Sequence, residues 1–286
     1  MDKIIPEKIN NYLILIRINK PIGFMLLLWP CWFSLAYIDL PQSSLINYYM
    51  LFLAGSVIMR SAGCIINDLV DQNIDLKIKR TKSRPIAART ISKLEAFILL
   101  ILLLLIGLVI LLQFKFHTVL IGLACTPLII LYPFMKRITF WPQLFLGIVF
   151  NWGVIITSVE FFGTLTKEFF ILYLACIFWT IGYDTIYAFQ DLKDDKKNKI
   201  KSTAVLFNDK GKYLVFTSYS FMFLLIGYLT LSSENHTFVI FFLIAIFFFI
   251  FFNLKTWEYK SESNSGEKFR QNNLFGVMIF LYLLSF

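Results

Sequence analysis

Long apolar runs recur along this chain and are separated by short polar segments. Each run is roughly 17–25 residues long, which is the length an α-helix needs to cross the hydrocarbon core of a bilayer. The pattern predicts nine such helices and therefore an all-α, polytopic membrane bundle around a lipid-accessible cavity. The expected spans are 21–38, 48–68, 93–113, 116–134, 141–158, 167–190, 211–231, 236–254 and 270–286.

Composition agrees with this pattern. The chain is 58% hydrophobic and 16% charged, with a mean hydropathy of +0.71, far more apolar than a soluble domain requires. The longest polar stretches, 69–92, 191–210 and 255–272, are too short to form cores of their own. We therefore expect one transmembrane domain over residues 1–286.

The distribution of basic residues gives the orientation. With the N-terminus in the cytoplasm, 24 of the 27 Lys and Arg residues fall in segments on the cytoplasmic side. Only Lys115 and Lys167 fall outside, and Arg60 lies within a span. This bias follows the positive-inside rule. Topology thus accounts for most of the net charge of +9, and nucleic acid is not an expected partner.

A first acidic motif lies at the cytoplasmic end of the second expected span. At about 100° per residue, Asn67, Asp71 and Asp75 lie within about 80° of one another on a helix, with Asp68 close by. Grouped carboxylates repel one another unless a cation lies between them. A basic segment follows directly, with Lys77, Lys79, Arg80, Lys82, Arg84 and Arg89.

Arg60 projects onto the same helix stripe as this motif, about 10 Å deeper in the membrane at 1.5 Å rise per residue. An arginine within a span is costly and usually has an anionic partner. It either recognises an anionic ligand or pairs with a neighbouring helix, and we favour the ligand.

A second acidic motif lies at the cytoplasmic end of the sixth expected span. We expect Asp184, Asp191 and Asp195 to fall within about 40° on one helix face, with Tyr187 beside them and Asp194 further round. Four lysines follow, Lys196, Lys197, Lys199 and Lys201. A third basic element is YPFMKR at 132–137, whose Lys136 and Arg137 either anchor the topology or clamp a phosphate.

Carboxylates beside basic loops indicate a diphosphate site bridged by Mg²⁺, which prefers oxygen ligands and substrate phosphates. A transporter would instead place its ionisable residues near the middle of the membrane on broken helices. A soluble isoprenyl chain-elongating synthase is excluded by the hydropathy.

These motifs resemble those of the UbiA family of intramembrane prenyltransferases, in particular the branch that acts on aromatic acids. One departure is Gln72, where this branch often has Arg. The matching segments are KPIG at 20–23, LLLWP at 26–30, MRSAGCIIND at 59–68, KRTKSRPIA at 79–87, YPFMKR at 132–137, DTIYAFQDLKDD at 184–195 and IKST at 200–203.

The resemblance implies transfer of a polyprenyl group from polyprenyl diphosphate to 4-hydroxybenzoate, in ubiquinone biosynthesis, at the cytoplasmic side of a bacterial inner membrane. Naphthoate, homogentisate or haem are the alternative acceptors. Mg²⁺ would be held by Asn67, Asp71, Asp75, Asp191 and Asp195, with Asp68 supporting the cluster. The diphosphate would contact Arg17, Arg80, Arg84 and Lys136. Arg60 would bind the benzoate carboxylate, and Tyr132, Tyr187 and Asp184 would surround the reacting carbons.

Overall fold

A computed structural model describes residues 6–231 and 236–285, and all regular secondary structure within those ranges is helical. The principal helices are α2 (Ile22–Ala36), α3 (Ile46–Asp75), α4 (Lys93–Leu111), α5 (Phe116–Ala124), α6 (Thr126–Ile138), α7 (Pro142–Phe150), α8 (Trp152–Phe162), α9 (Lys167–Ala188), α12 (Gly211–Thr230), α13 (His236–Lys255) and α14 (Glu262–Leu284). Short helices α1 (Glu7–Leu15), η1 (Gln42–Leu45), η2 (Phe189–Asp191), α10 (Leu192–Lys197), α11 (Thr203–Phe207) and η3 (Asn208–Lys210) connect them or precede them.

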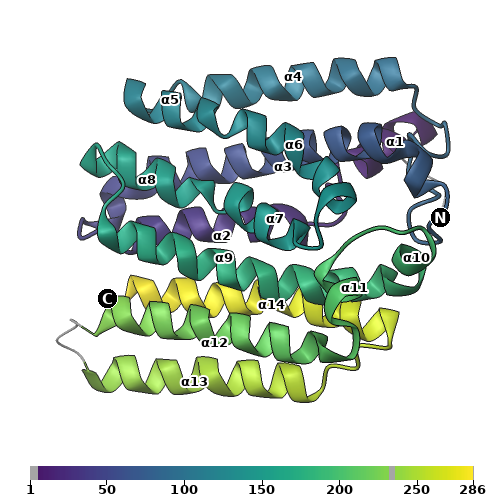
Figure 1. The fold of residues 1–286 in the computed structure, drawn as a ribbon. Coiled ribbons are helices and arrows are strands. Elements are labelled where there is room, and N and C mark those ends of the chain that lie inside the picture. Colours follow the sequence, from purple (N-terminus) through teal and green to yellow (C-terminus); the bar gives the residue numbers. More distant parts are fainter. Residues whose placement is uncertain (1–5, 232–235, 286) are drawn as a thin grey trace.

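The long helices run roughly parallel or antiparallel to one another (Figure 1). Six helical segments in the described part of the chain are long and apolar enough to cross a membrane, and Ile22–Ala36 and Val239–Lys255 are shorter apolar helices. Helix α14 is not among them, since its first half carries Glu267, Lys268 and Arg270, so the helix count is roughly consistent with the nine expected passes. The prediction of an all-α membrane bundle is therefore confirmed, whereas the single domain boundary of 1–286 stays a prediction.

Two expected spans are each divided into two helices. The span at 116–134 breaks at Cys125, just before Pro127, whose ring has no N–H to donate to the preceding turn. The span at 141–158 breaks at Asn151, whose side-chain amide donates to the Gly147 carbonyl (2.6 Å) and to Thr180 Oγ1 (3.0 Å). The Gly147 carbonyl also accepts the backbone N–H of Asn151 (3.3 Å), so the side-chain amide adds a second donor there and links the break to α9.

Helix boundaries at the two acidic motifs also differ from those expected. Helix α3 continues through Asp75, so the whole first motif is helical. The second motif is not one helix: α9 ends at Ala188, and the 3₁₀ turn η2 joins it to α10. A 3₁₀ turn advances about 120° per residue, so the expected single stripe of Asp184, Asp191 and Asp195 is wrong.

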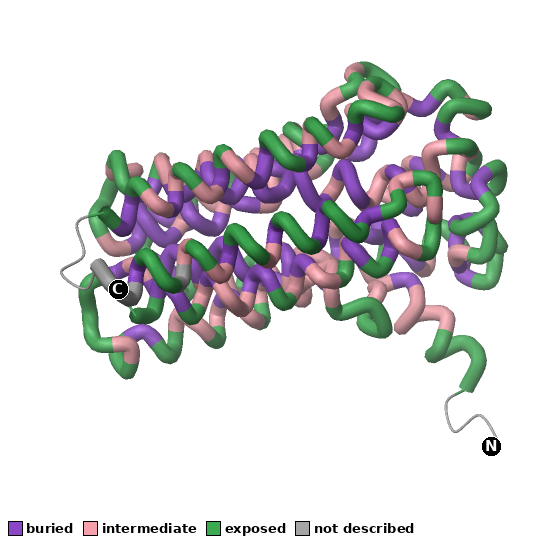
Figure 2. Tube along the Cα trace, turned by 90° about the horizontal axis from the view of Figure 1, so that it is seen from below, coloured by how far each residue is buried: buried purple, intermediate pink, exposed green. Residues whose placement is uncertain are grey.

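Helix α9 lies at the centre of the bundle (Figure 1), and many of its side chains are buried, among them Trp179 and Tyr183. Figure 2 shows buried positions along the interior of the bundle and exposed positions along its outside. Glycines permit close approach to other helices. A Cβ at Gly182 would lie 2.3 Å from the Tyr219 ring of α12, and one at Gly276 of α14 would lie 2.5 Å from the Trp29 ring of α2. Helix α4 lies at an edge of the bundle and exposes a leucine- and isoleucine-rich face suited to lipid.

A buried carboxylate ties together α3, α5 and α8 at the end of the bundle where α5 begins. Glu160 accepts hydrogen bonds from Tyr48 Oη (3.0 Å), Thr118 Oγ1 (2.7 Å) and the Lys115 backbone N–H (3.0 Å). Three donors satisfy the charge in an otherwise apolar region. The two acidic motifs lie at the opposite end, near α1 and α10 (Figure 1).

Candidate active site

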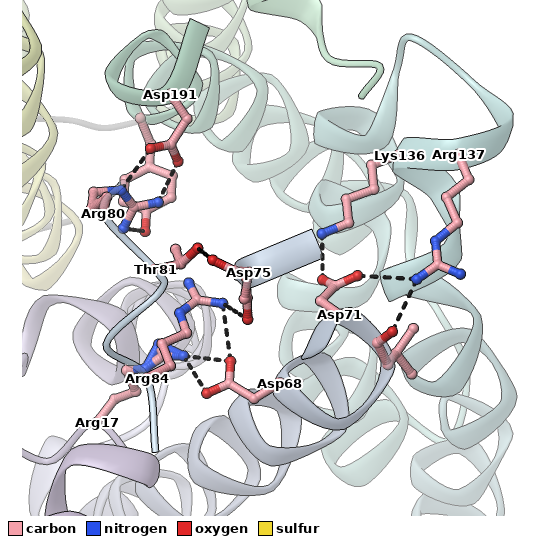
Figure 3. Close-up of polar contacts among 12 residues, drawn as sticks. Arg17, Asp68, Asp71, Asp75, Arg80, Thr81, Arg84, Lys136, Arg137 and Asp191 are labelled. Carbon is pink, nitrogen blue, oxygen red and sulfur yellow. Dashed lines mark hydrogen bonds and ion pairs between the residues drawn. The ribbon is translucent and has the colours of Figure 1, made fainter. Parts of the chain in front are cut away.

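An ion pair joins the two acidic motifs across 111 residues of sequence. Arg80, in the loop that follows α3, contacts both carboxylate oxygens of Asp191, with Nε lying 2.8 Å from Oδ1 (Figure 3). Its Nη1 donates to the Tyr187 hydroxyl at 2.9 Å, and its guanidinium carbon lies 4.9 Å from the centroid of that ring. Burial alone would lower the pKa of Arg80, but Tyr187 and Asp191 outweigh it and the net pKa is raised. Arg80 therefore stays cationic.

Three carboxylates of the first motif lie on one face of α3. Asp68, Asp71 and Asp75 are spaced by three and four residues, so successive turns bring them together. Their exposed fractions are 1%, 0% and 3%. Buried carboxylates at this density require cationic partners, because the desolvation of each ion is costly and the charges repel.

Two arginines from different segments pair with Asp68. Arg17, in the turn after α1, donates from Nη2 to both carboxylate oxygens at 2.6 and 2.8 Å. Arg84, from the loop after α3, donates from Nη1 to Asp68 Oδ1 (3.1 Å) and to Asp75 Oδ2 (2.9 Å). Arg17 has a positive φ of 59°, which is uncommon for a residue with a side chain. Asp68 is thus the point where the N-terminal turn, α3 and the basic loop meet.

Asp71 faces a different pair of cations, on α6. Lys136 Nζ donates to Oδ2, and Arg137 Nη2 donates to Oδ1 (3.3 Å) and to the Val70 carbonyl (3.0 Å) (Figure 3). Lys136 and Arg137 are therefore more than topology anchors. They bring α6 against the middle of the acidic face.

Arg60 lies deeper along α3, and its buried Nε has no hydrogen-bond partner within the described residues. Its guanidinium carbon lies 5.3 Å from the Phe150 ring centroid. Gly23 of α2 leaves room for it, because a Cβ there would lie only 2.8 Å from Arg60 Nε. No ion pair is formed by Arg60 in the described part of the chain. A buried donor without a partner is unusual in a native structure.

Four other expected site residues are brought to the same region without fixed partners. Asp195 is buried, and Asn67, Tyr132 and Asp184 are half-buried. Across residues 6–231 and 236–285, none of the four side chains makes a hydrogen bond or an ion pair. These groups remain available to a ligand.

Comparison with known proteins assigns the family. The model of the UbiA prenyltransferase family matches residues 27–283. The chain belongs to this family.

Curated relatives are similar over most of the chain. A 4-hydroxybenzoate geranyltransferase from Lithospermum erythrorhizon is 38% identical over 98% of this chain and 91% of its own length. A 4-hydroxybenzoate octaprenyltransferase from Pseudoalteromonas translucida is 34% identical, with 99% and 96% covered. A mitochondrial 4-hydroxybenzoate polyprenyltransferase from Arabidopsis thaliana is 44% identical over 74% of this chain, which spans about half of that relative (53%).

Solved structures agree on the fold. A UbiA homologue from Aeropyrum pernix gives a TM-score of 0.72 at 20% identity, covering 91% of this chain and 95% of that one. A homologue from Archaeoglobus fulgidus bound to GPP and Mg²⁺ gives 0.67 at 17% identity, covering 96% and 100%. At these identities the likeness supports the UbiA fold alone.

The donor chemistry of the site suits a hard divalent cation. The expected ligands supply only carboxylate and amide oxygens, the ligands Mg²⁺ prefers. In the described residues, however, no three His, Cys, Asp or Glu side chains are close enough together to hold a metal by themselves. Asp71, Asp75 and Asp191 instead bind Lys or Arg. The metal ligands stay a prediction, and the observed arrangement is a set of ion pairs.

Sequence reasoning missed three contributors to this arrangement. Arg137 was considered as one of a pair of cations, but only Lys136 was assigned to the site. The Lys79 backbone N–H donates to Asp194 Oδ2 at 3.0 Å, and Thr81 Oγ1 donates to the Asp75 carbonyl at 3.1 Å. Arg137 had a signal, since it adjoins Lys136 in the YPFMKR segment. The other two depend on how the loop folds back, which no local pattern encodes.

Proposed function

We propose that this UbiA-family protein transfers a polyprenyl group from polyprenyl diphosphate to 4-hydroxybenzoate, at the ring carbon meta to the carboxylate, in a Mg²⁺-dependent reaction of ubiquinone biosynthesis. The site would face the cytoplasm from a bacterial inner membrane. Most Lys and Arg residues lie at the end of the bundle that carries the two acidic motifs, and the positive-inside rule places that end in the cytoplasm. Relatives named for 4-hydroxybenzoate prenyl transfer support this acceptor.

The observation that carries the proposal is the separation of two anion sites along α3. The first is the set of carboxylates and cations around Asp68, Asp71 and Asp75. The second is Arg60, eight residues before Asp68 and therefore about 12 Å deeper at 1.5 Å rise per residue. Arg60 carries an unpartnered buried Nε. A reaction between a diphosphate and an aromatic carboxylic acid requires two such sites at two depths.

The ion pairs suggest how the first site accepts a diphosphate. When the diphosphate enters, Arg17, Arg80, Arg84 and Lys136 exchange their carboxylate partners for phosphate oxygens, since guanidinium and ammonium groups donate equally well to either. Asp71, Asp75, Asp191 and Asp195, with Asn67, are then free to hold Mg²⁺. Bound Mg²⁺ supplies positive charge against which the leaving diphosphate is stabilised.

The remaining residues surround the reacting carbons. The bond between the allylic carbon and the diphosphate oxygen breaks, and its electron pair leaves with the diphosphate. The Tyr132 and Tyr187 rings offer negative faces to the allylic cation. The ring carbon ortho to the phenol oxygen forms the new carbon–carbon bond and then releases its proton. Asp184, which has no hydrogen-bond partner in the described structure, is the candidate acceptor of that proton.

Other acceptors within the family are the main alternatives: naphthoate, homogentisate and haem. Membership of a prenyltransferase family argues against a transporter.

The purified full chain, given geranyl diphosphate and Mg²⁺, should prenylate 4-hydroxybenzoate far faster than the other three acceptors. If one of these acceptors were turned over faster, that compound would be the acceptor instead of 4-hydroxybenzoate. Cation flux in liposomes without any prenylated product would show that the protein is a transporter and refute the proposed enzymatic activity.

A further inference from the structure

A cavity of about 510 Å³ lies outside the candidate active site, between the end of α3 and the start of α4. Its volume falls within the range of small-molecule sites in proteins. It faces away from the carboxylate cluster, because Gln72 and Leu76 line it from a different face of α3. The residues around it are Gln72, Asn73, Leu76, Ile86, Arg89, Ile91, Ser92 and Lys93.

Two cations border this cavity without any partner of their own. Arg89 and Lys93 are exposed, and within residues 6–231 and 236–285 neither side chain forms a hydrogen bond or an ion pair. They differ in this from Arg17, Arg80, Arg84 and Lys136, which all bind carboxylates. At the N-terminus of α4, the side chains of Ser92 and Glu95 each accept the other's backbone N–H, so these two N–H groups do not bind the anion. The positive charge at this cavity is therefore available to a ligand.

Exposed apolar side chains on α4 follow directly in sequence after the residues that line the cavity. Ile86 and Ile91 form part of its lining and are buried. The first turns of α4 then expose Leu94 (68%) and Phe97 (52%) on the outside of the bundle, where α4 forms an edge (Figure 1). A ligand that fills this site would meet cations and amides at one end and lipid-facing hydrocarbon at the other.

We propose that this cavity binds the head group of an anionic phospholipid. The phosphate lies between Arg89 and Lys93, and the acyl chains follow the exposed face of α4. The head-group hydroxyls face the Asn73 amide and the side-chain oxygen of Gln72, whose Nε2 donates to the Ile86 carbonyl (3.1 Å). Free phosphate is also an anion but gains nothing from the apolar surface. The inference is independent of the transfer reaction, because it uses none of the residues assigned to it.

The test uses the purified full chain in a neutral detergent, titrated with phosphatidylglycerol, phosphatidylcholine or inorganic phosphate. Bound lipid is counted by native mass spectrometry. The test variant is Arg89→Asn with Lys93→Gln. Asparagine suits position 89 because Arg89 has a φ of 59°. The control is Lys255→Gln with Lys260→Gln, which removes two exposed cations from the same end of the bundle.

Phosphatidylglycerol should bind in preference to phosphatidylcholine. Each basic residue near a membrane surface contributes about a fivefold gain in affinity for anionic lipid. The test variant should therefore lose about 25-fold in affinity and the control less than twofold. An equal loss of affinity for phosphatidylglycerol in both variants would overturn the proposal, because it would mean that the lipid responds to surface charge anywhere at this end of the bundle. Competition by millimolar inorganic phosphate as effective as that by the lipid would overturn it in favour of a simple phosphate site.

Discussion

Arg80 and Asp191 form a two-point ion pair that closes the loop after α3 onto the short helix η2 (Figure 3). A second contact, from the Lys79 N–H to Asp194, lies beside it at 3.0 Å. Together they hold the two acidic motifs at a fixed separation. In the proposed reaction, Arg80 must leave Asp191 when a diphosphate arrives, so this pair is a contact of the unliganded site.

Removing one carboxylate from either motif should abolish most activity. Asp71→Asn and Asp191→Asn should each lower turnover at least a hundredfold, because each loses a charge that holds the metal and aligns a cation. Turnover is measured with geranyl diphosphate and 4-hydroxybenzoate at saturating Mg²⁺. Asp209→Asn is the matched control: Asp209 is exposed and accepts a hydrogen bond from Tyr259 (3.0 Å). Near-normal turnover in either test variant would contradict the metal-site assignment.

Removal of divalent metal should stop the reaction reversibly. The five expected ligands provide only oxygen atoms, so EDTA should abolish product formation and Mg²⁺ should restore it. Zn²⁺ should restore less, since it favours nitrogen and sulfur ligands. Product that persists undiminished after EDTA treatment and dialysis would rule out the proposed diphosphate site.

Loss of Glu160 should destabilise the bundle without changing its chemistry. Glu160→Ala leaves the Tyr48 hydroxyl, the Thr118 hydroxyl and the Lys115 N–H without their acceptor. Of these donors only the Thr118 hydroxyl is fully buried, and an unsatisfied buried donor costs about 1–3 kcal/mol, so the free energy of unfolding should fall by about 1–3 kcal/mol. Thermal unfolding in detergent measures this, with KM for both substrates as the control. Unchanged unfolding would mean that water replaces the carboxylate.

The fold followed from the sequence wherever lipid dictates the pattern. Spans in a bilayer need long apolar helices with paired backbone groups, so hydropathy located them. It did not locate the breaks at Cys125 and Asn151. The residues around each break are as apolar as those within a helix, and a window average cannot detect one local hydrogen bond such as that from Asn151 to Gly147.

For the candidate site, the sequence was enough to predict only the relative positions of residues that lie on the same helix. The spacing of Asp68, Asp71 and Asp75 was enough to place them on one face, since α3 is continuous there. Which cation pairs with which carboxylate was not predictable. Arg84 reaches two carboxylates and Arg80 crosses to the other motif because of the folding of their loop.

Arg60 should determine the affinity for an acceptor that carries a carboxylate. Arg60→Ala should raise KM for 4-hydroxybenzoate strongly while changing KM for the prenyl diphosphate little, because Arg60 lies about two turns deeper than the acidic face. Both constants are measured in detergent. If Arg60 only connected helices, KM would rise equally for both substrates. An equal rise would therefore refute the role of Arg60 in carboxylate binding.

Gly23 offers a test of the same site that keeps the arginine charge. In Gly23→Ala the new Cβ would lie 2.8 Å from Arg60 Nε and 3.3 Å from Nη2. Both atoms belong to the far end of a flexible side chain, so the guanidinium should move aside without unfolding the protein. KM for 4-hydroxybenzoate should then rise about tenfold, as expected for a displaced charge-assisted hydrogen bond of about 1.4 kcal/mol. Gly63→Ala is the matched control on α3, since a Cβ there meets nothing within 4 Å. If KM for the acceptor stayed the same in Gly23→Ala, the carboxylate would have to bind somewhere other than Arg60.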